Sequence, residues 1–266
     1  MKLATQDKSF FPQNMKEKLE AIRLMGFDAF EIDGSRLINE FQDVKKAVQE
    51  TAVPVVTACG GYRGWIGDFD KEKRKSAVQD IISILCHLER IGAQGIVVPA
   101  AWGMFSKRLP PLIPPRSEEQ DRAVLLDSLD KLNEAAKETG TYIYLEPLNR
   151  YEDHMLNRLE DAVSLIEEGR FSNVKITADF FHMNIEEPKI EDSIRKAKKY
   201  IGHVHLADSH RYQPGDGHLD FSSGLKALKE IGYTGYLAFE CRVLGVPELE
   251  VYRQSVKYIR ELLQRI

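Results

Sequence analysis

Long apolar runs are missing from this 266-residue sequence, and cysteine is scarce. No stretch approaches the roughly 18–20 apolar residues that a membrane-spanning helix needs. The first residues, MKLATQDKSFF, lack the apolar core of a secretory signal peptide. The three cysteines, Cys59, Cys86 and Cys241, are an odd and widely spaced set without CxxC spacing, which predicts free thiols in a reducing compartment. We therefore expect a cytoplasmic protein without a transmembrane helix.

An excess of positive charge is also missing, because the formal net charge is −4. This value indicates no basic surface for nucleic acid or for an anionic membrane, and a small molecule is the expected partner. A glycine-rich dinucleotide-binding fingerprint is absent after the first apolar segment. The hydrophobic fraction of 43% and the charged fraction of 29% are typical of a globular protein.

What the sequence does contain is a regular alternation of two kinds of segment. Eight short apolar segments rich in β-branched residues are expected as strands: 2–6, 27–33, 53–59, 94–100, 141–146, 174–179, 203–208 and 235–240. Between and after them lie eight segments expected as helices: 14–25, 39–50, 71–91, 117–139, 157–168, 188–200, 221–231 and 247–265. The alternation predicts a parallel sheet covered by helices. Eight such units favour a closed (β/α)₈ TIM barrel, one domain over 1–266, rather than an open doubly wound sheet.

Local signals mark several ends of these segments. The glycines of MGF, IGA, ETGT and IGY follow predicted helices, where a left-handed C-cap is favourable. Ser117 with Gln120, and Asn157 with Glu160, have capping-box spacing. The segment 102–117 holds four of the eleven prolines. It is expected either as a stiff surface loop or as a lid or subunit contact.

Four consecutive predicted strands carry a side chain that can bind a metal, three of them as the last residue and the strand 203–208 after its first two residues: Glu146, Asp179, Glu240 and His205. A carboxylate after a run of apolar residues is costly to bury unless it is paired or binds a cation. One such residue is ordinary, but the carboxyl ends of barrel strands meet at one rim, where active sites lie. Three carboxylates and one imidazole favour one Mn²⁺ or Mg²⁺ ion, with Co²⁺ as a further option. The coordination positions left open suit the carbonyl and hydroxyl oxygens of a keto-sugar.

Several longer strings carry a family resemblance. EPLNRYEDHMLN, DFFHMNIEE, HVHLADSHRYQPGDGHLDF and GYLAFECR resemble the xylose-isomerase-like sugar isomerase/epimerase superfamily, in particular its D-tagatose (psicose) 3-epimerase branch. IVVPAAWGMF, RLPP, YLEPLNRY and HRYQPG are still more similar to bacterial 3-dehydro-guloside 4-epimerase-type proteins. The resemblance extends over nearly the whole chain, with four motifs in the same order and spacing.

The resemblance implies a divalent-metal-dependent sugar epimerase that acts on a ketose or 3-keto-glycoside through an enediolate. It implies that Glu146, Asp179, His205 and Glu240 hold one cation, most often Mn²⁺. Glu146 and Glu240 would also be the catalytic acid–base pair, because inverting a stereocentre needs a base on one face and an acid on the other. Residues that would contact substrate oxygens are Glu152, His182 and Arg211. The resembling families are usually dimers or tetramers, so a homo-oligomer is expected.

Three histidines near these motifs are expected to lie outside the active site, and His203 among them is expected to be structural. His203 is expected to point to the helix layer if His205 faces the rim, and His210 and His218 are expected on the loop surface.

The remaining polar and aromatic residues near strand ends keep two interpretations each. Trp65 and Trp102 either stack on a sugar or pack a lid. Glu31 and Gln6 either line the pocket or cap their strands, and Cys59 is expected to be a buried thiol rather than a nucleophile.

Other activities remain as alternatives. An aldose–ketose isomerase or an inosose-dehydratase-like lyase would use the same α-deprotonation at the same site. An endonuclease IV-like nuclease shares this barrel, but it needs about three zinc ions and many histidine ligands, and the chain has seven histidines. A non-catalytic sugar-binding protein would not need an open site with three carboxylates.

Overall fold

The computed structural model describes residues 1–107 and 113–266, which form a closed barrel of parallel strands in the order β1 to β8. The strands are β1 (Lys2–Thr5), β2 (Ala29–Ile32), β3 (Val55–Cys59), β4 (Gly95–Pro99), β5 (Tyr142–Glu146), β6 (Val174–Asp179), β7 (Ile201–Leu206) and β8 (Tyr236–Phe239). Strand β1 pairs with β8 over Lys2 to Thr5, which closes the barrel. The predicted TIM barrel is confirmed.

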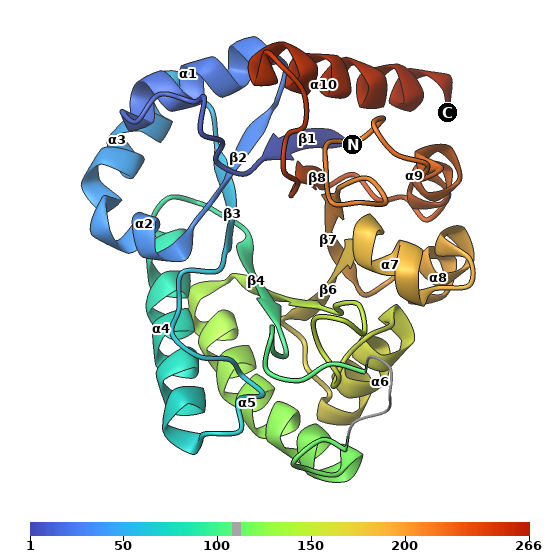
Figure 1. Cartoon of the computed structure of the whole chain (residues 1–266). Coiled ribbons are helices and arrows are strands. Elements are labelled where there is room, and N and C mark those ends of the chain that lie inside the picture. Colours follow the sequence, from blue (N-terminus) through green and yellow to red (C-terminus); the bar gives the residue numbers. More distant parts are fainter. Residues whose placement is uncertain (108–112) are drawn as a thin grey trace.

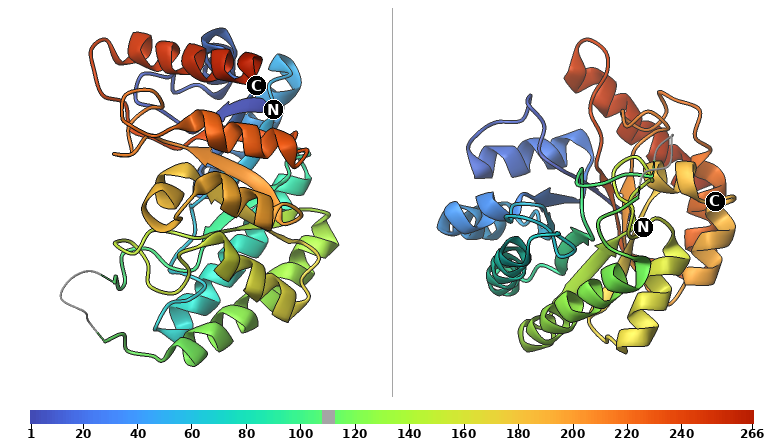
Figure 2. Two further views of the ribbon diagram at one scale, coloured as in Figure 1. Left: turned by 90° about the vertical axis from the view of Figure 1, so that its right-hand side faces the viewer. Right: turned by 60° about the horizontal axis from the view of Figure 1, so that its bottom comes forward.

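Helices surround the sheet on its outer side (Figures 1 and 2). They are α1 (Met15–Met25), α2 (Gly34–Asn39), α3 (Phe41–Thr51), α4 (Lys71–Glu89), α5 (Glu118–Thr139), α6 (Leu159–Gly169), α7 (Phe180–Glu186), α8 (Ile190–Ala197), α9 (Phe221–Glu230) and α10 (Glu248–Arg265). None of the helices in the described part of the chain is both long and apolar enough to cross a membrane.

Two short helices were not expected from the sequence. Helix α2 begins after Asp33, whose side chain accepts a hydrogen bond from the backbone N–H of Arg36. Helix α7 follows β6 without a connecting loop, and Asp179 caps it by accepting from the backbone N–H of His182. Both helices are too short to show an apolar periodicity in the sequence, so their N-cap residues are the only local signal of where they begin.

The capping predictions had mixed outcomes. The capping box of Ser117 and Gln120 at the start of α5 is confirmed. The one expected from Asn157 was wrong, because α6 is capped one residue later, where the Asp161 side chain accepts from the backbone N–H of Arg158. The Asn157 amide instead donates to the carbonyls of Leu148 and Asp153, holding the loop after β5.

Strand alternation separates the barrel interior from the helix layer. On β8, Leu237 and Phe239 belong to the large core between sheet and helices. Tyr236 and Ala238 belong with Ala4 to a smaller apolar cluster. Since successive side chains of a strand point to opposite faces, this cluster fills the barrel interior.

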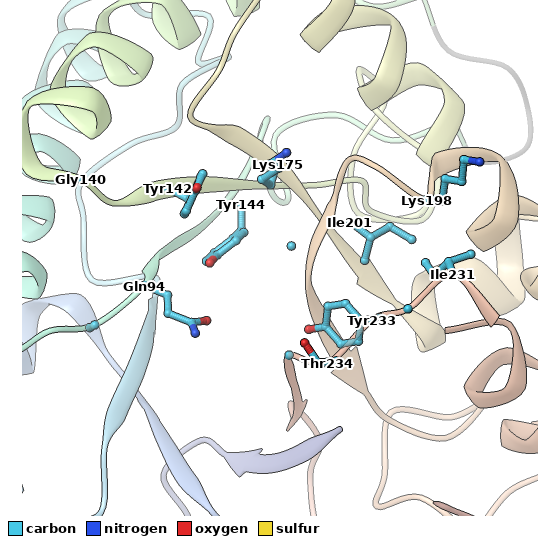
Figure 3. A pocket seen from close by; sticks show the side chains of 14 residues that line it. Gln94, Gly140, Tyr142, Tyr144, Lys175, Lys198, Ile201, Ile231, Tyr233 and Thr234 are labelled. Carbon is cyan, nitrogen blue, oxygen red and sulfur yellow. The ribbon is translucent and has the colours of Figure 1, made fainter. Parts of the chain in front are cut away.

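A hollow of about 510 Å³ opens at the N-terminal ends of β4 to β8. Figure 3 shows Tyr144, Gln94 and Tyr233 around it. Since active sites of this fold lie at the opposite rim, this hollow is set apart from the predicted metal ligands.

The predicted lid or subunit contact in 102–117 falls partly on residues 108–112, which lie outside the described residues. Its first part contacts the loop after β5: the backbone N–H of Gly103 donates to the carbonyl of Glu152, and that of Lys107 to the carbonyl of Arg150. A role of the whole segment as a lid or subunit contact stays a prediction.

The glycines predicted as C-caps have left-handed conformations: Gly26, Gly92, Gly140 and Gly232.

At Gly140, φ is +66° and an added Cβ would meet no atom within 4 Å. We therefore expect Gly140→Ala to lower the free energy of unfolding by about 1–2 kcal/mol through backbone strain alone. Gly140→Asn should cost less, because asparagine tolerates this conformation. Thermal or denaturant unfolding measures both, and equal losses in the two variants would contradict a backbone origin.

Candidate active site

Four side chains from successive strand ends meet inside the C-terminal rim of the barrel. Glu146 ends β5, Asp179 ends β6, His205 lies on β7 and Glu240 follows β8. One potential ligand atom of each lies within 4.8 Å of those of the others. His205 Nδ1 lies 2.7 Å from Glu240 Oε2, 3.0 Å from Glu146 Oε1 and 3.7 Å from Asp179 Oδ2. The structure thus brings together the complete predicted ligand set.

Strand register contributes to this meeting. Between β6 and β7 the pairing shifts by one residue after Ile176, so that Asp179 lies opposite His205. A similar shift between β2 and β3 skips Val56 and places Thr57 opposite Glu31. Such bulges commonly re-aim side chains at barrel rims near active sites.

The two candidate acid–base residues differ in their electrostatic surroundings. Burial and the nearby charge of Glu240 raise the pKa of Glu146 to about 8. Removal from water also opposes ionisation of Glu240, but His205 and Arg211 outweigh it and hold the pKa of Glu240 well below its usual range. The pair therefore favours one protonated and one ionised carboxyl group, a pattern typical of acid–base partners.

Arg211 lies between two of the predicted ligands. Its guanidinium donates to Asp179 Oδ2 at 2.6 Å and to Glu240 Oε2 at 2.5 Å, and it lies 4.8 Å from the centre of the Phe181 ring. Its backbone φ is +67°, a conformation that is uncommon outside glycine. Backbone strain of this kind concentrates at functional sites, where surrounding contacts maintain it.

The other two predicted substrate contacts are held by Asn149. Its backbone N–H and its side-chain amide donate to His182 Nδ1 at 3.1 and 2.8 Å. The amide also donates to Glu152 Oε1 at 2.9 Å. Burial lowers the pKa of His182, so the neutral ring accepts at Nδ1 and carries its hydrogen on Nε2. Asn149 was not among the predicted site residues, although its position three residues after Glu146 was a usable signal.

A pocket of about 190 Å³ opens above these groups. Glu146, Glu240, Arg211, His182 and Glu152 line its polar side.

Aromatic rings line the same pocket. Tyr62, Trp65 and Trp102 all belong to its wall, and the two indole rings lie 6.3 Å apart. Trp102 Nε1 donates to Glu152 Oε2 at 2.8 Å, while 56% of the residue is exposed. A position at the pocket wall is compatible with both interpretations of the tryptophans, stacking on a sugar or packing a lid, and the choice between them stays a prediction. Rings beside polar groups are well suited to contact the apolar face of a sugar.

The expectation for His203 was wrong. Residues two apart on a strand share a face, so His203 points into the barrel as His205 does, not to the helix layer. It is fully buried, and its Nε2 lies 2.8 Å from Glu31 Oε2. His210 and His218 are exposed, as expected.

Glu31 was expected to line the pocket or to cap its strand, and it does neither, whereas the same choice for Gln6 stays a prediction. Glu31 is buried in the middle of the barrel and accepts from Gln6 Nε2 at 3.0 Å and from Thr57 Oγ1 at 2.6 Å. Its burial favours the neutral acid, but His205 and His203 keep the pKa of Glu31 well below its usual range.

Cys59 lies 3.7 Å from Glu240 Oε1. Burial and the nearby carboxylates raise the pKa of this thiol well above its usual value. A high pKa disfavours the thiolate, so Cys59 is a poor nucleophile, and the three cysteines are free, as expected.

The donor set at the rim fits a divalent cation. It offers carboxylate oxygens and one imidazole nitrogen, the ligands that Mn²⁺ and Mg²⁺ accept. Placing three carboxylates this close together, with only one of them partly exposed, is unfavourable without positive charge. In residues 1–107 and 113–266, the one other group of this kind is Glu31, His203 and His205, which shares His205. The described part of the chain thus shows no separate histidine cluster of the sort that the nuclease alternative requires.

Comparisons with known proteins agree with this architecture. The 3-dehydro-D-guloside 4-epimerase of Escherichia coli K12 is 50% identical over 260 residues, which cover 98% of this chain and 99% of the relative. A D-psicose 3-epimerase of Agrobacterium fabrum is 27% identical over 231 residues, covering 84% and 77% of the two chains. The crystal structure of 3-keto-D-glucoside 4-epimerase from E. coli, in its apo form, superposes with a TM-score of 0.96 at 49% identity, covering 98% and 99%.

These relatives are epimerases, which are isomerases, and the present chain is likewise a sugar epimerase. The family model described as xylose isomerase-like TIM barrel matches residues 19–262. The chain therefore belongs to the xylose isomerase-like TIM barrel family.

Proposed function

We propose that this chain is a divalent-metal-dependent epimerase that inverts a carbon next to the ketone of a 3-keto-glycoside or a ketose. The observation that carries the proposal is the convergence of Glu146, Asp179, His205 and Glu240 on one pocket. The whole chain would act as one catalytic domain, because strands from both of its ends close the barrel.

The names of the relatives support one type of reaction. A 3-dehydro-guloside and a 3-keto-glucoside differ only in configuration at C4, the carbon beside the C3 ketone. A ketose 3-epimerase inverts C3, the carbon beside the C2 ketone. In both reactions the C–H bond next to a carbonyl is broken and remade on the opposite face. The higher identity to the 4-epimerase favours a 3-keto-glycoside as the substrate.

Glu146, Asp179, His205 and Glu240 would hold the cation. When bound, a divalent cation would act as a Lewis acid that polarises the ketone and acidifies the neighbouring C–H. Mn²⁺ is the ion we expect, with Mg²⁺ or Co²⁺ as alternatives that the donor set also accepts.

The side chains of the pocket would carry the proton steps. One carboxylate of the pair Glu146 and Glu240 would remove the proton from one face, and the other would return a proton to the opposite face. Arg211 would donate to the oxygen on which negative charge develops. His182, with its hydrogen on Nε2, and Glu152 would orient substrate hydroxyl groups, and Asn149 holds both of them.

The proposal also includes a cytoplasmic location and assembly into a dimer or tetramer.

We expect His205→Ala to lose bound Mn²⁺ and activity together. Metal content measured after loading and desalting reports the first, and turnover the second. Mn²⁺ should also raise the Tm of the unchanged protein, since a ligand at about 100 times its Kd stabilises the folded state by about 2.7 kcal/mol, but should not raise that of the variant. His218→Ala, an exposed histidine on a loop, is the control and should behave like the unchanged protein. Full metal content in His205→Ala would refute this ligand set.

Glu146→Gln and Glu240→Gln test the two-base mechanism, because loss of a positioned general acid or base costs roughly 10²–10⁴-fold in rate. We expect each variant to exchange the α-proton of one epimer with D₂O without forming product, and the two variants to act on opposite epimers. NMR of 3-keto-glycosides and ketoses in D₂O measures exchange and product together.

Two controls accompany this experiment. Metal occupancy is confirmed in both variants, because the two glutamates are also candidate ligands. Glu168→Gln, an exposed carboxylate on α6, should leave turnover unchanged. If either variant with full metal keeps near-normal turnover, one base is sufficient and the two-base mechanism is refuted.

A further inference from the structure

A buried hydrogen-bond network joins the candidate metal ligand His205 to Glu31, on the side of the imidazole ring that faces away from the other three candidate ligands. His205 Nδ1 faces the three carboxylates, and its Nε2 lies 2.9 Å from Glu31 Oε1. Glu31 is 1% exposed and His205 fully buried, so water does not compete for this contact.

From this geometry we propose that Glu31 is a positioning residue: by accepting the Nε2 hydrogen of His205, it keeps Nδ1 free to bind the cation and fixes the plane of the ring. The inference rests on the proposed function, because it presumes that His205 is a ligand. An imidazole binds a metal through a nitrogen without hydrogen, and the hydrogen bond made by the other nitrogen decides which one that is.

The surroundings of Glu31 fit an acceptor that is itself held in place. Its Oε1 accepts from His205 and from Gln6 Nε2, and its Oε2 accepts from Thr57 Oγ1. His203 Nε2 adds a fourth contact at 2.8 Å, with an alignment that falls short of a good hydrogen bond. Three residues, His205, Gln6 and Thr57, thus donate to the carboxylate, and Thr57 reaches it because of the register shift between β2 and β3.

The same contacts argue against a second metal site at Glu31, His203 and His205. Both carboxylate oxygens of Glu31 already accept hydrogen bonds. His205 cannot offer Nε2 to a second ion while this nitrogen carries the hydrogen that Glu31 accepts. Donation to Glu31 and ligation through Nδ1 are compatible, whereas two-metal binding would require the ring to lose both hydrogens.

Glu31→Gln tests the proposal with little change in volume. An amide keeps one acceptor oxygen but loses the negative charge of the carboxylate, so the hydrogen bond that it accepts from His205 Nε2 is weaker. We expect the Kd for Mn²⁺, measured by calorimetric titration of metal-free protein, to rise about 10–100-fold, the usual effect of losing such a partner. Glu31→Asp keeps the charge and should recover part of the affinity.

Tyr252→Phe is the matched control, because it removes another buried hydrogen bond of the barrel, between Tyr252 Oη and Thr5 Oγ1 at 2.7 Å. Its hydroxyl is not among the partners of Glu31 or His205. It should lower the Tm but leave the Kd for Mn²⁺ unchanged. Equal rises of Kd in Tyr252→Phe and Glu31→Gln would reduce Glu31 to a purely structural role and overturn the proposal.

A second measurement needs no variant and covers the case in which Glu31→Gln does not fold. In protein labelled with ¹⁵N-histidine and loaded with diamagnetic Mg²⁺ or Zn²⁺, His205 should carry its hydrogen on Nε2. A hydrogen on Nδ1, or ligation through Nε2, would overturn the inference. If the unchanged protein binds no cation, the proposed function fails. If it binds a cation but the Glu31→Gln substitution leaves the Kd unchanged, or the His205 hydrogen lies on Nδ1, only the inference about Glu31 fails.

Discussion

Negative charge gathered inside a barrel is the constraint on which the rest of this structure depends. Glu31, Glu146 and Asp179 are buried, and Glu240 is only partly exposed, all within reach of a single imidazole. Carboxylates are not tolerated in such a place unless hydrogen bonds or positive charge compensate them. His205 contacts all four, and Arg211 contacts Asp179 and Glu240. A divalent cation held at the rim would supply the further positive charge that this arrangement favours.

The same concentration of charge shifts the pKa values of Glu146 and Glu240 in opposite directions, although both are glutamates. Glu146 lies deeper and meets the charge of Glu240, whereas Glu240 meets Arg211 and reaches the pocket. The proposed two-base epimerisation would need one group to take a proton and another to give one, and a pair of carboxyl groups with opposite pKa displacements would meet that need without a further residue type. The barrel supplies the opposed placement, because β5 and β8 lie three strands apart around the ring.

The side chains that would orient a substrate lie outside the strands, on loops and on the short helix α7. Asn149 holds His182 and Glu152, the chain after β4 brings Trp102 against Glu152, and the turn after β7 forces Arg211 into a strained conformation beside Asp179. Catalytic groups on a rigid sheet with substrate contacts on loops are typical of this fold, which accommodates different substrates by loop variation.

The sequence by itself determined the elements and the identity of the strand-end residues. Apolar periodicity located all eight strands and the long helices, and Glu146, Asp179, His205 and Glu240 were identified because each directly ends or follows an apolar run. These signals are local. They predict a common site because the parallel strands of a barrel all end at the same rim. The part played by Glu31, Thr57 and His203 depended on tertiary structure alone. Glu31 on β2 meets His205 on β7 only across a closed barrel, and Thr57 faces Glu31 only because one residue of β3 is skipped in the pairing. Such contacts arise from barrel closure and strand register, which no short segment of sequence encodes.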